Sequence, residues 1–283
     1  MLKVLSLGAG VQSTAVLLMS ARGVFEKLDA AVFADTQWEP REVYKHLDWL
    51  EKEAGRYGIP VHRVTAGNIR EDAIKSTVRG LKGEGKRWVS IPFYTKTDGA
   101  GQGGQLRRQC TSEYKIRPVD KFIRRKLLGL KKGERATPGL VELWFGISAD
   151  EMRRVRQSRD RWKINHYPLI GLPGPILERP YTRARCKDWL EQEYPERQIP
   201  RSACLGCPYH SRAEWKMLQM GDQDEWLDIV EFDRKTRHCG GENDEMFIHN
   251  SRLPIENVDF QSGDDTSRQE NLFENECEGM CGV

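Results

Sequence analysis

The sequence predicts an α/β protein with a doubly wound, mostly parallel sheet that carries helices on both faces, followed by a small, mainly helical or irregular C-terminal extension. Two observations predict it: apolar runs of strand length recur in the first third of the chain, and each precedes a stretch with helical periodicity. Strands that alternate with helices form parallel βαβ units. The 283 residues can bury one substantial core. We therefore expect an α/β domain over residues 1–200 and an extension with an acidic tail over 201–283.

Three strands are expected in the first third of the chain, and each leads into a helix. The strands lie at 3–7, 30–34 and 59–64, and the helices begin near residues 11, 41 and 68. In the second helix Val43, Leu47 and Leu50 fall on one face, which is the spacing of an amphipathic helix. Residues 6–13 and Asp35 follow the first two strands, so they are expected at the edge of the sheet where ligands bind.

The rest of the chain is less regular. Residues 80–106 are rich in glycine and polar residues and predict a long loop, which in a compact domain is usually functional. A basic helix is expected at 112–130 and a further strand at 140–145, which ends at Gly146. Beyond Pro180 we expect short helices around a cysteine-containing turn, and little periodicity remains after about residue 240.

The segment after the first strand has the residues of a phosphate-binding loop. Gly8 and Gly10 allow a sharp turn and a close backbone approach to a ligand, and the amides at the start of the following helix favour an anion. Ser13 and Thr14 are placed to offer hydroxyls to phosphate oxygens. A dinucleotide fingerprint needs a third glycine where Ser13 stands, and a Walker loop needs a lysine that this loop lacks. A tight strand-to-helix turn without a ligand remains the alternative.

Charge is distributed unevenly, although the net charge is only +3. Residues 107–135 hold eleven Lys and Arg against three acids, whereas residues 242–278 hold eleven acids against two arginines. The middle of the chain can therefore attract a polyanion such as nucleic acid, and the tail would repel one. Solvated helix faces and a disordered acidic tail are the simpler interpretation. No apolar run reaches the ~18 residues of a membrane span and no secretory signal opens the chain, so we expect a cytoplasmic protein without a membrane partner.

The seven cysteines, an odd number, favour metal or sulfur chemistry over a disulfide framework. Cys204 and Cys207 have the Cys-x-x-Cys spacing of a metal-binding turn. With Cys110 and His210 they could form a structural zinc site. A thioredoxin-like redox pair is a weaker alternative, because the motif does not open a βα unit.

These features resemble, in the same order, the motifs of a known family. Residues 8–13, Gly-Ala-Gly-Val-Gln-Ser, resemble the pyrophosphate loop Ser-Gly-Gly-x-Asp-Ser, with Gln12 at the place of the Asp. Asp35-Thr36-Gln37 resembles Asp-Thr-Gly, and the segment from Gly146 to Arg154, which contains Glu151, resembles a later element with Gly, Glu and Arg.

The cysteines extend this resemblance. Residues 110–119 resemble the element Cys-Cys-x-x-x-Lys-x-x-Pro-Leu, with Thr111 in place of the second cysteine, and residues 204–208 resemble Cys-x-x-Cys-Pro. Over roughly residues 1 to 215 the chain is similar to the 3′-phosphoadenylylsulfate (PAPS) reductase-like family of the adenine nucleotide α-hydrolase fold, also called PP-loop ATP pyrophosphatases.

The resemblance implies specific ligands. Family members with these cysteines hold a [4Fe-4S] cluster, so Cys110, Cys204 and Cys207 are expected to bind one, with Cys186 as the candidate fourth ligand and zinc as the alternative metal. ATP with Mg²⁺ is expected at the edge of the sheet. The implied nucleotide-binding residues are Ser6, Gly8, Gly10, Gln12, Ser13, Thr14, Asp35, Thr36, Gly146, Glu151 and Arg154.

Two cysteines near the C-terminus, Cys277 and Cys281, are the expected catalytic residues. They lie in a glycine-containing segment that could carry a persulfide into a site. Sulfonucleotide reductases use a cysteine within Glu-Cys-Gly-x-His near their C-terminus, and Glu276-Cys277 resembles its beginning.

Three functions are compatible with these features. The first is an ATP pyrophosphatase-type enzyme that adenylates a nucleic-acid oxygen so that sulfur can replace it through the cluster, which would give tRNA thiolation or DNA phosphorothioation. The second is a sulfonucleotide reductase that forms sulfite, and the third is a non-catalytic nucleotide- or zinc-binding module. The expected partners are a tRNA or DNA, a cysteine desulfurase or other sulfur donor, and a second copy of the chain in a homodimer.

Overall fold

The computed structural model describes residues 1–75, 90–97, 103–239 and 244–261. Its centre is a five-stranded sheet in the order β3-β2-β1-β5-β6, and every pair of neighbouring strands is parallel. The predicted α/β fold with a doubly wound sheet is confirmed. The strands are β1 (Leu2–Leu7), β2 (Ala30–Asp35), β3 (Val61–Thr65), β5 (Val141–Trp144) and β6 (Lys163–His166).

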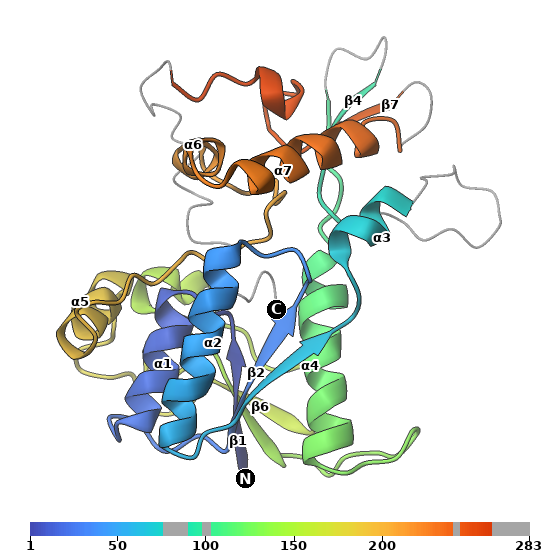
Figure 1. Ribbon diagram of the computed structural model, residues 1–283. Coiled ribbons are helices and arrows are strands. Elements are labelled where there is room, and N and C mark those ends of the chain that lie inside the picture. The colour runs from blue at the N-terminus through green and yellow to red at the C-terminus, as the bar shows by residue number, and fades with distance from the viewer. Residues whose placement is uncertain (76–89, 98–102, 240–243, 262–283) are drawn as a thin grey trace.

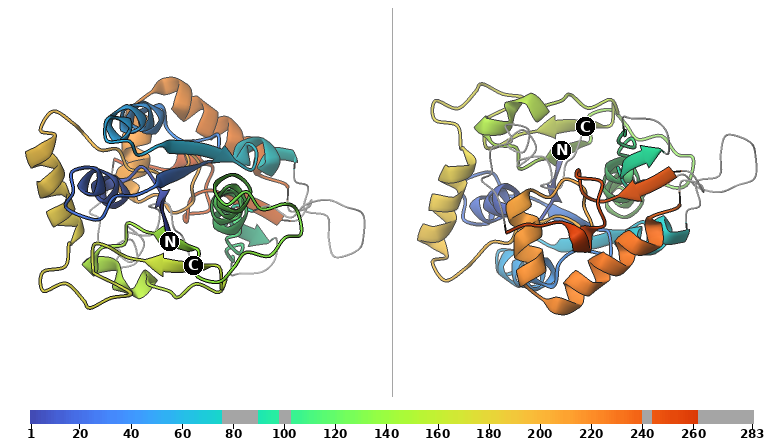
Figure 2. Two further views of the ribbon diagram at one scale, coloured as in Figure 1. Left: turned by 90° about the horizontal axis from the view of Figure 1, so that it is seen from below. Right: turned by 90° about the horizontal axis from the view of Figure 1, so that it is seen from above.

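The strand side chains alternate between two cores, one on each face of the sheet. In β1, Leu5 and Leu7 point into one core and Val4 into the other. The first core lies under α1 (Val11–Ala21), α2 (Arg41–Arg56) and α5 (Arg183–Glu193). The second lies under a continuous helical run made of η1 (Thr111–Ile116), α4 (Arg117–Phe122) and η2 (Ile123–Leu127). Figures 1 and 2 show these helices on opposite faces of the sheet.

The basic helix predicted at 112–130 is this η1–α4–η2 run. Its central turn is α-helical, whereas the turns before and after it are π-helical. Pro118, in the first turn of α4, has no amide hydrogen to donate to the preceding turn. The run packs Val119 and Ile123 against the sheet and turns its basic residues outward or toward the carboxyl edge of the strands.

A second layer lies over the carboxyl edge of the sheet (Figure 1). It contains α3 (Ile69–Lys75), α6 (Arg212–Met220), α7 (Gln223–Thr236), the short helix η4 (Ile255–Asn257) and the antiparallel pair β4 (Tyr94–Thr97) and β7 (Asp244–Phe247). Its core joins residues from both sides of position 200: Trp38, Phe93 and Tyr114 pack with Trp215 and Phe232. The boundary expected between residues 200 and 201 therefore runs through a shared core.

Three of the described strands were not expected from the sequence. β4 lies within 80–106, which we predicted to be loop, β6 lies in a polar stretch, and β7 lies beyond residue 240, where little periodicity remains. The strand predicted at 140–145 is present as β5 at Val141–Trp144. Within the described residues, no helix has both the length and the apolar character needed to cross a bilayer.

Strand order places a crevice at the carboxyl edge of the sheet. From β1 the chain runs first to β2 and β3 on one side, and then to β5 and β6 on the other. The connections that leave β1 and β5 therefore run in opposite directions. The place where they diverge is the switch point at which sheets of this kind bind ligands. The loop 8–13 follows β1 and the segment from Gly146 follows β5, so both predicted nucleotide-binding elements lie at this point.

Candidate functional site

The loop after β1 is closed by its own hydrogen bonds. The hydroxyl of Ser13 accepts from the amide of Gly8 at 3.2 Å and donates to the carbonyl of Gly10 at 3.3 Å. Ala9 has φ of 60°, a left-handed conformation that is costly for a residue with a Cβ. This geometry holds the amides at the start of α1 toward the edge of the sheet, as an anion-binding turn requires.

Gly146 closes the other side of this loop. A Cβ on Gly146 would lie 2.6 Å from the backbone nitrogen of Ser13 and 2.8 Å from the carbonyl carbon of Gln12. No side chain fits there, because both neighbours are backbone atoms. The segment after β5 thus packs directly on the first turn of α1.

Three predicted residues meet in a buried network beside this contact. The side-chain nitrogen of Gln12, Nε2, donates to Glu151 Oε2 at 3.1 Å, and Glu151 also forms an ion pair with Arg154. Arg183, at the start of α5, donates to Gln12 Oε1 at 2.8 Å. Gln12 and Glu151 are both almost fully buried. At the place of the expected Asp, Gln12 therefore connects the loop to η3 (Ala149–Arg154) and α5.

Thr14 lies in the interface between α1 and α2. Its hydroxyl is 3.0 Å from Nε2 of His46, and both side chains are buried. Burial lowers the pKa of His46 to about 4, with a smaller contribution from the positive charge of Arg197. The Thr14 side chain therefore packs α1 on α2 and does not face the edge of the sheet.

The Asp35–Thr36 segment connects β2 to the cysteines. Asp35 accepts hydrogen bonds from the amide of Gln37 and from the hydroxyl of Tyr44, at 2.7 and 2.9 Å. The Thr36 hydroxyl donates to Glu39 Oε1 at 3.0 Å and lies 3.2 Å from the sulfur of Cys204. Thr36 is fully buried, so its hydroxyl positions groups within the protein.

Cys110, Cys204 and Cys207 line one small pocket, together with Thr36 and Lys115. Burial raises the pKa of Cys204 well above its usual range, and the nearby negative charge of Glu39 adds to the increase. The structure therefore brings together the three cysteines that the sequence grouped. Across the part of the chain that the structure describes, no three Cys, His, Asp or Glu side chains converge on a single metal-ion position.

The cysteine turn is fixed from both sides. The backbone amide of Leu205 donates to the carbonyl of Trp38 at 3.0 Å, and a Cβ on Gly206 would clash with the edge of the Trp38 ring. On the other side, Nε2 of His210 pairs with the carbonyl of Cys204 at 2.9 Å. His210 is thus engaged with the backbone of the turn.

The candidate fourth ligand, Cys186, is elsewhere. It is fully buried in α5, in the core that α5 shares with α1, whereas Cys110 and Cys204 adjoin the core of the second layer and Cys207 lines their pocket. An apolar site of this kind suits a cysteine that packs as a small hydrophobic residue. The structure therefore does not bring Cys186 to the pocket of the other three cysteines. Cys277 and Cys281 lie outside the described residues.

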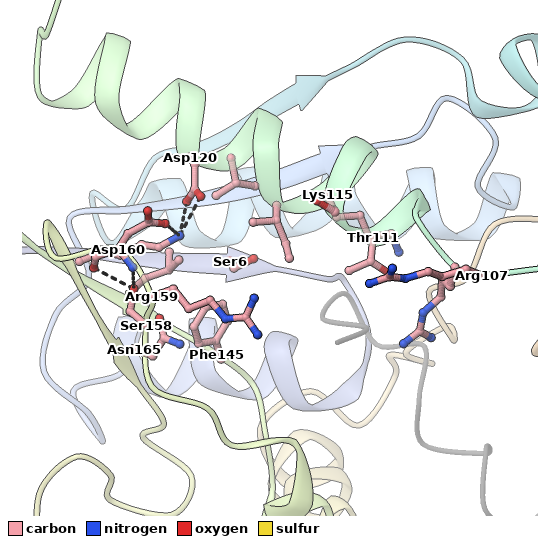
Figure 3. A pocket seen from close by; sticks show the side chains of 16 residues that line it. Ser6, Arg107, Thr111, Lys115, Asp120, Phe145, Ser158, Arg159, Asp160 and Asn165 are labelled. Carbon is pink, nitrogen blue, oxygen red and sulfur yellow. Dashed lines mark hydrogen bonds and ion pairs between the residues drawn. The ribbon is translucent and has the colours of Figure 1, made fainter. Parts of the chain in front are cut away.

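A larger cavity, of about 500 Å³, opens between the η1–α4 helices and strands β1, β5 and β6 (Figure 3). Of the predicted nucleotide-binding residues, only Ser6 lines it among those described; Gly8 lines a smaller pocket at the ends of β1 and β2 with Glu39 and Ser202. The large cavity is lined by Ser6, Arg107, Arg108, Thr111, Ser112, Lys115, Ile116, Val119, Asp120, Leu143, Phe145, Ser158, Arg159, Asp160, Lys163 and Asn165.

The three pockets adjoin one another. Arg108, Thr111 and Lys115 line both the large cavity and the cysteine pocket. Lys115 also lines the small pocket beside Gly8. One helical turn, η1, therefore faces the nucleotide loop, the large cavity and the cysteines.

Several site residues were missed by the sequence reasoning. Arg183 has no local signal, because it reaches Gln12 from 171 positions away along the chain. Glu39 follows the predicted Asp35–Thr36 segment by three residues, and this proximity is a signal that could have found it. Lys115 is the lysine of the predicted element at 110–119, but the sequence assigned it no role. Comparisons of the chain with family models, with curated proteins and with solved structures each found no match.

Proposed function

We propose that the protein is a cytoplasmic ATP pyrophosphatase-type enzyme that adenylates an oxygen of a nucleic acid so that sulfur can replace it. The observation that carries the proposal is the position of Lys115, which lines the pocket beside the β1 loop, the large basic cavity and the pocket of the three cysteines. A phosphate-binding loop, a cavity for an anionic substrate and a set of sulfur ligands therefore surround one ammonium group.

The loop after β1 and the start of α1 would hold the ATP phosphates. Backbone amides there favour negative charge, and Mg²⁺ would offset the remainder. The acceptor oxygen attacks the α-phosphorus of ATP, the bond from that phosphorus to the bridging oxygen breaks, and pyrophosphate leaves with the electron pair. Lys115 is placed to stabilise negative charge that develops between the nucleotide and the acceptor.

Sulfur then takes the place of the activated oxygen. A sulfide equivalent, supplied by a cysteine desulfurase or another donor, attacks the adenylated atom, and AMP leaves with the oxygen. Cys110, Cys204 and Cys207 fit a [4Fe-4S] cluster in kind, because three thiols line one pocket with apolar neighbours such as Ile69 and Ile91. When bound, the cluster supplies an iron site for the incoming sulfur.

The test is release of pyrophosphate from ATP by anaerobically purified protein, with Mg²⁺ and with tRNA or DNA. We expect release that depends on the nucleic acid, and loss of release in Gly146→Ala, where the new Cβ meets the backbone of α1. Gly55→Ala is the matched control, since a Cβ at Gly55 meets nothing within 4 Å. No release with any nucleic acid would contradict the proposal. Sulfite formation from adenylylsulfate without ATP would point instead to a sulfonucleotide reductase.

A further inference from the structure

The large cavity contains more than ATP binding needs. Of residues 6–14, all of which the structure describes, only Ser6 lines it, and the cavity extends from there between α4 and strands β5 and β6. A volume of about 500 Å³ is enough for a small organic ligand. The cavity therefore offers space for a second molecule beside the ATP loop.

The two ends of the cavity differ in charge (Figure 3). At one end lie three cationic side chains, Arg107, Arg108 and Lys115. At the other end, on the far side of Ser6, the carboxylates Asp120 and Asp160 lie with the cations Arg159 and Lys163, so the charges there balance. The excess positive charge is at the Arg107 end, so an anionic group on a ligand belongs there.

The end of the cavity with Asp120 and Asp160 presents hydrogen-bond acceptors. Lys163, whose side chain is 8% exposed, donates to both oxygens of Asp120 at 2.6 and 2.8 Å, and its ammonium is 3.4 Å from Asp160. An ammonium has three donors, and these three carboxylate oxygens account for them. The lone pairs that remain on the two carboxylates are acceptors for a ligand, and Arg159 adds donors at the same end.

Asn165 adds a further acceptor. Its side-chain nitrogen donates to the carbonyl of Arg156 at 2.9 Å and lies 3.4 Å from the hydroxyl of Tyr167. These contacts fix the orientation of the Asn165 side-chain amide. Within the described residues, its oxygen Oδ1 has no hydrogen-bond partner. Asn165 is 6% exposed and lines the cavity, so a ligand with a donor at this end would find an acceptor in Oδ1.

Apolar side chains form the walls between the two ends. Val119 and Ile116 lie on the helical side, and Leu143 and Phe145 lie on the side of β5. Walls of this kind suit the faces of a planar ring. The cavity thus combines an acceptor end, apolar walls and a cationic end in that order.

We propose that this cavity is a subsite for one nucleotide of the acceptor nucleic acid, with an amino-bearing base at the Asp120–Asn165 end and its phosphate at the Arg107–Lys115 end. The inference rests on the proposed function, because it supplies the molecule to be modified. Cytosine, adenine and guanine carry an amino group that can donate to these acceptors. Uracil and thymine have no amino group; their N3–H is the one donor on that edge, and the carbonyl oxygens on either side of it would face the carboxylates.

The first experiment titrates the full-length protein with CMP, UMP and cytidine by calorimetry in the presence of saturating ATP. We expect CMP to bind roughly 10-fold more tightly than UMP, because UMP has no amino group for these acceptors and places carbonyl oxygens beside the carboxylates. Cytidine should bind more weakly than CMP because it lacks the phosphate. Equal affinity for CMP and UMP, or loss of CMP binding when ATP is added, would overturn the proposal.

Two variants and a control assign the ends. Asp120→Asn offers an amide donor to the base and should narrow or reverse the preference for CMP over UMP, whereas Arg107→Gln should weaken both by a similar factor. Asp48→Asn changes an exposed carboxylate outside the cavity and should leave both affinities unchanged. An unchanged preference in a folded Asp120→Asn variant would contradict the assignment of the base end.

Hydrogen exchange of the wild-type protein tests the site without a substitution near Lys163. CMP should protect amides in 111–127 and 141–166, the segments that line the cavity. Protection confined to 8–20 and 30–40 would place CMP in the ATP loop and overturn the proposal. If CMP binds as expected but no pyrophosphate is released, the proposed function fails and the subsite stands.

Discussion

Gly206 shows how one missing side chain shapes the cysteine turn. A Cβ there would clash with the edge of the Trp38 ring and lie 3.2 Å from the ring of Phe232. Trp38 cannot move aside easily, since its Nε1 donates to Asp228 at 2.6 Å and its ring lies 4.4 Å from that of Phe232. The turn that carries Cys204 and Cys207 is therefore held at a fixed distance from the β2–α2 connection.

We expect Gly206→Ala to lower the free energy of unfolding by about 1–3 kcal/mol, the usual range for overpacking a core. Urea unfolding followed by circular dichroism measures it. The control Gly55→Ala lies in α2 with open space around its Cβ and should instead stabilise by about 0.5–1 kcal/mol. Equal effects of the two variants would show that the Trp38 contact does not restrict position 206.

His46 predicts a loss of stability in acid. Its pKa is lowered to about 4 in the folded protein by burial, below the ~6.5 of an unfolded histidine. The unfolded chain therefore binds the proton first, and stability is complete above pH 6.5 and declines as the pH falls toward 4. His46→Gln keeps a polar partner for Thr14 but cannot titrate, so it should reduce this decline. The free energy of unfolding of the wild type and of His46→Gln can be measured at pH 7.5, 6, 5 and 4. Parallel curves for the two proteins would show that His46 has no part in the loss of stability in acid.

At the scale of elements, η3 is held to the β1 loop by a buried charge. Glu151 is 1% exposed, accepts from Gln12 and pairs with Arg154. Replacing Arg154 by Met removes the guanidinium from a buried carboxylate, which typically costs 3–5 kcal/mol. Denaturant unfolding should show a loss of about that size. The exposed ion pair of Arg41 with Asp222 is the matched comparison, and Arg41→Met should leave the midpoint nearly unchanged. A small effect of Arg154→Met would mean that the contacts of Gln12 with Glu151 and Arg183 are enough to hold η3 on the β1 loop.

The elements also show what the sequence could reveal. β1, β2 and β5 were predictable because they lie inside the sheet and most of their residues are buried. β3 is an edge strand, and it was predictable from Ile59, Val61 and Val64. β6 was missed because Lys163 and Asn165 point into the large cavity while Ile164 is 39% exposed, so this edge strand has no apolar run. β4 was missed because its four residues pair with β7, about 150 positions further along the chain.

The candidate site was predictable to a similar degree. Local motifs singled out Gly8, Gly146 and the three cysteines, because each follows a strand or forms a turn. The structure packs Gly146 on the loop after Gly8 and brings the cysteines into one pocket. Sequence alone could not separate Cys186, a buried thiol among apolar side chains, from a thiol in a ligand pocket. Arg183 was invisible for a different reason, since its contact with Gln12 exists only after α5 has packed on α1.

On the scale of the whole molecule, the two layers depend on one another. The second layer has a core to which Trp38, Phe93 and Tyr114 contribute from the first part of the chain, and Trp215 and Phe232 from the last. Polar contacts also join the layers: Arg41, at the start of α2, donates its backbone amide to Glu225 at 2.6 Å and pairs its guanidinium with Asp222. The nucleotide loop and the cysteine turn should therefore be lost together when the protein unfolds.

Hydrogen exchange tests this coupling directly. The slowest amides of α1, under the sheet, and of α7, in the second layer, should report the same free energy of opening within about 0.5 kcal/mol, because only global unfolding exposes either. Phe232→Ala removes a fully buried ring from the second layer and should lower both values equally, by about 3–5 kcal/mol. Leu17→Ala, in α1, should likewise lower both. If Phe232→Ala lowers the value for α7 and leaves α1 unchanged, the second layer opens by itself, and access to the cysteines is then governed by that local opening.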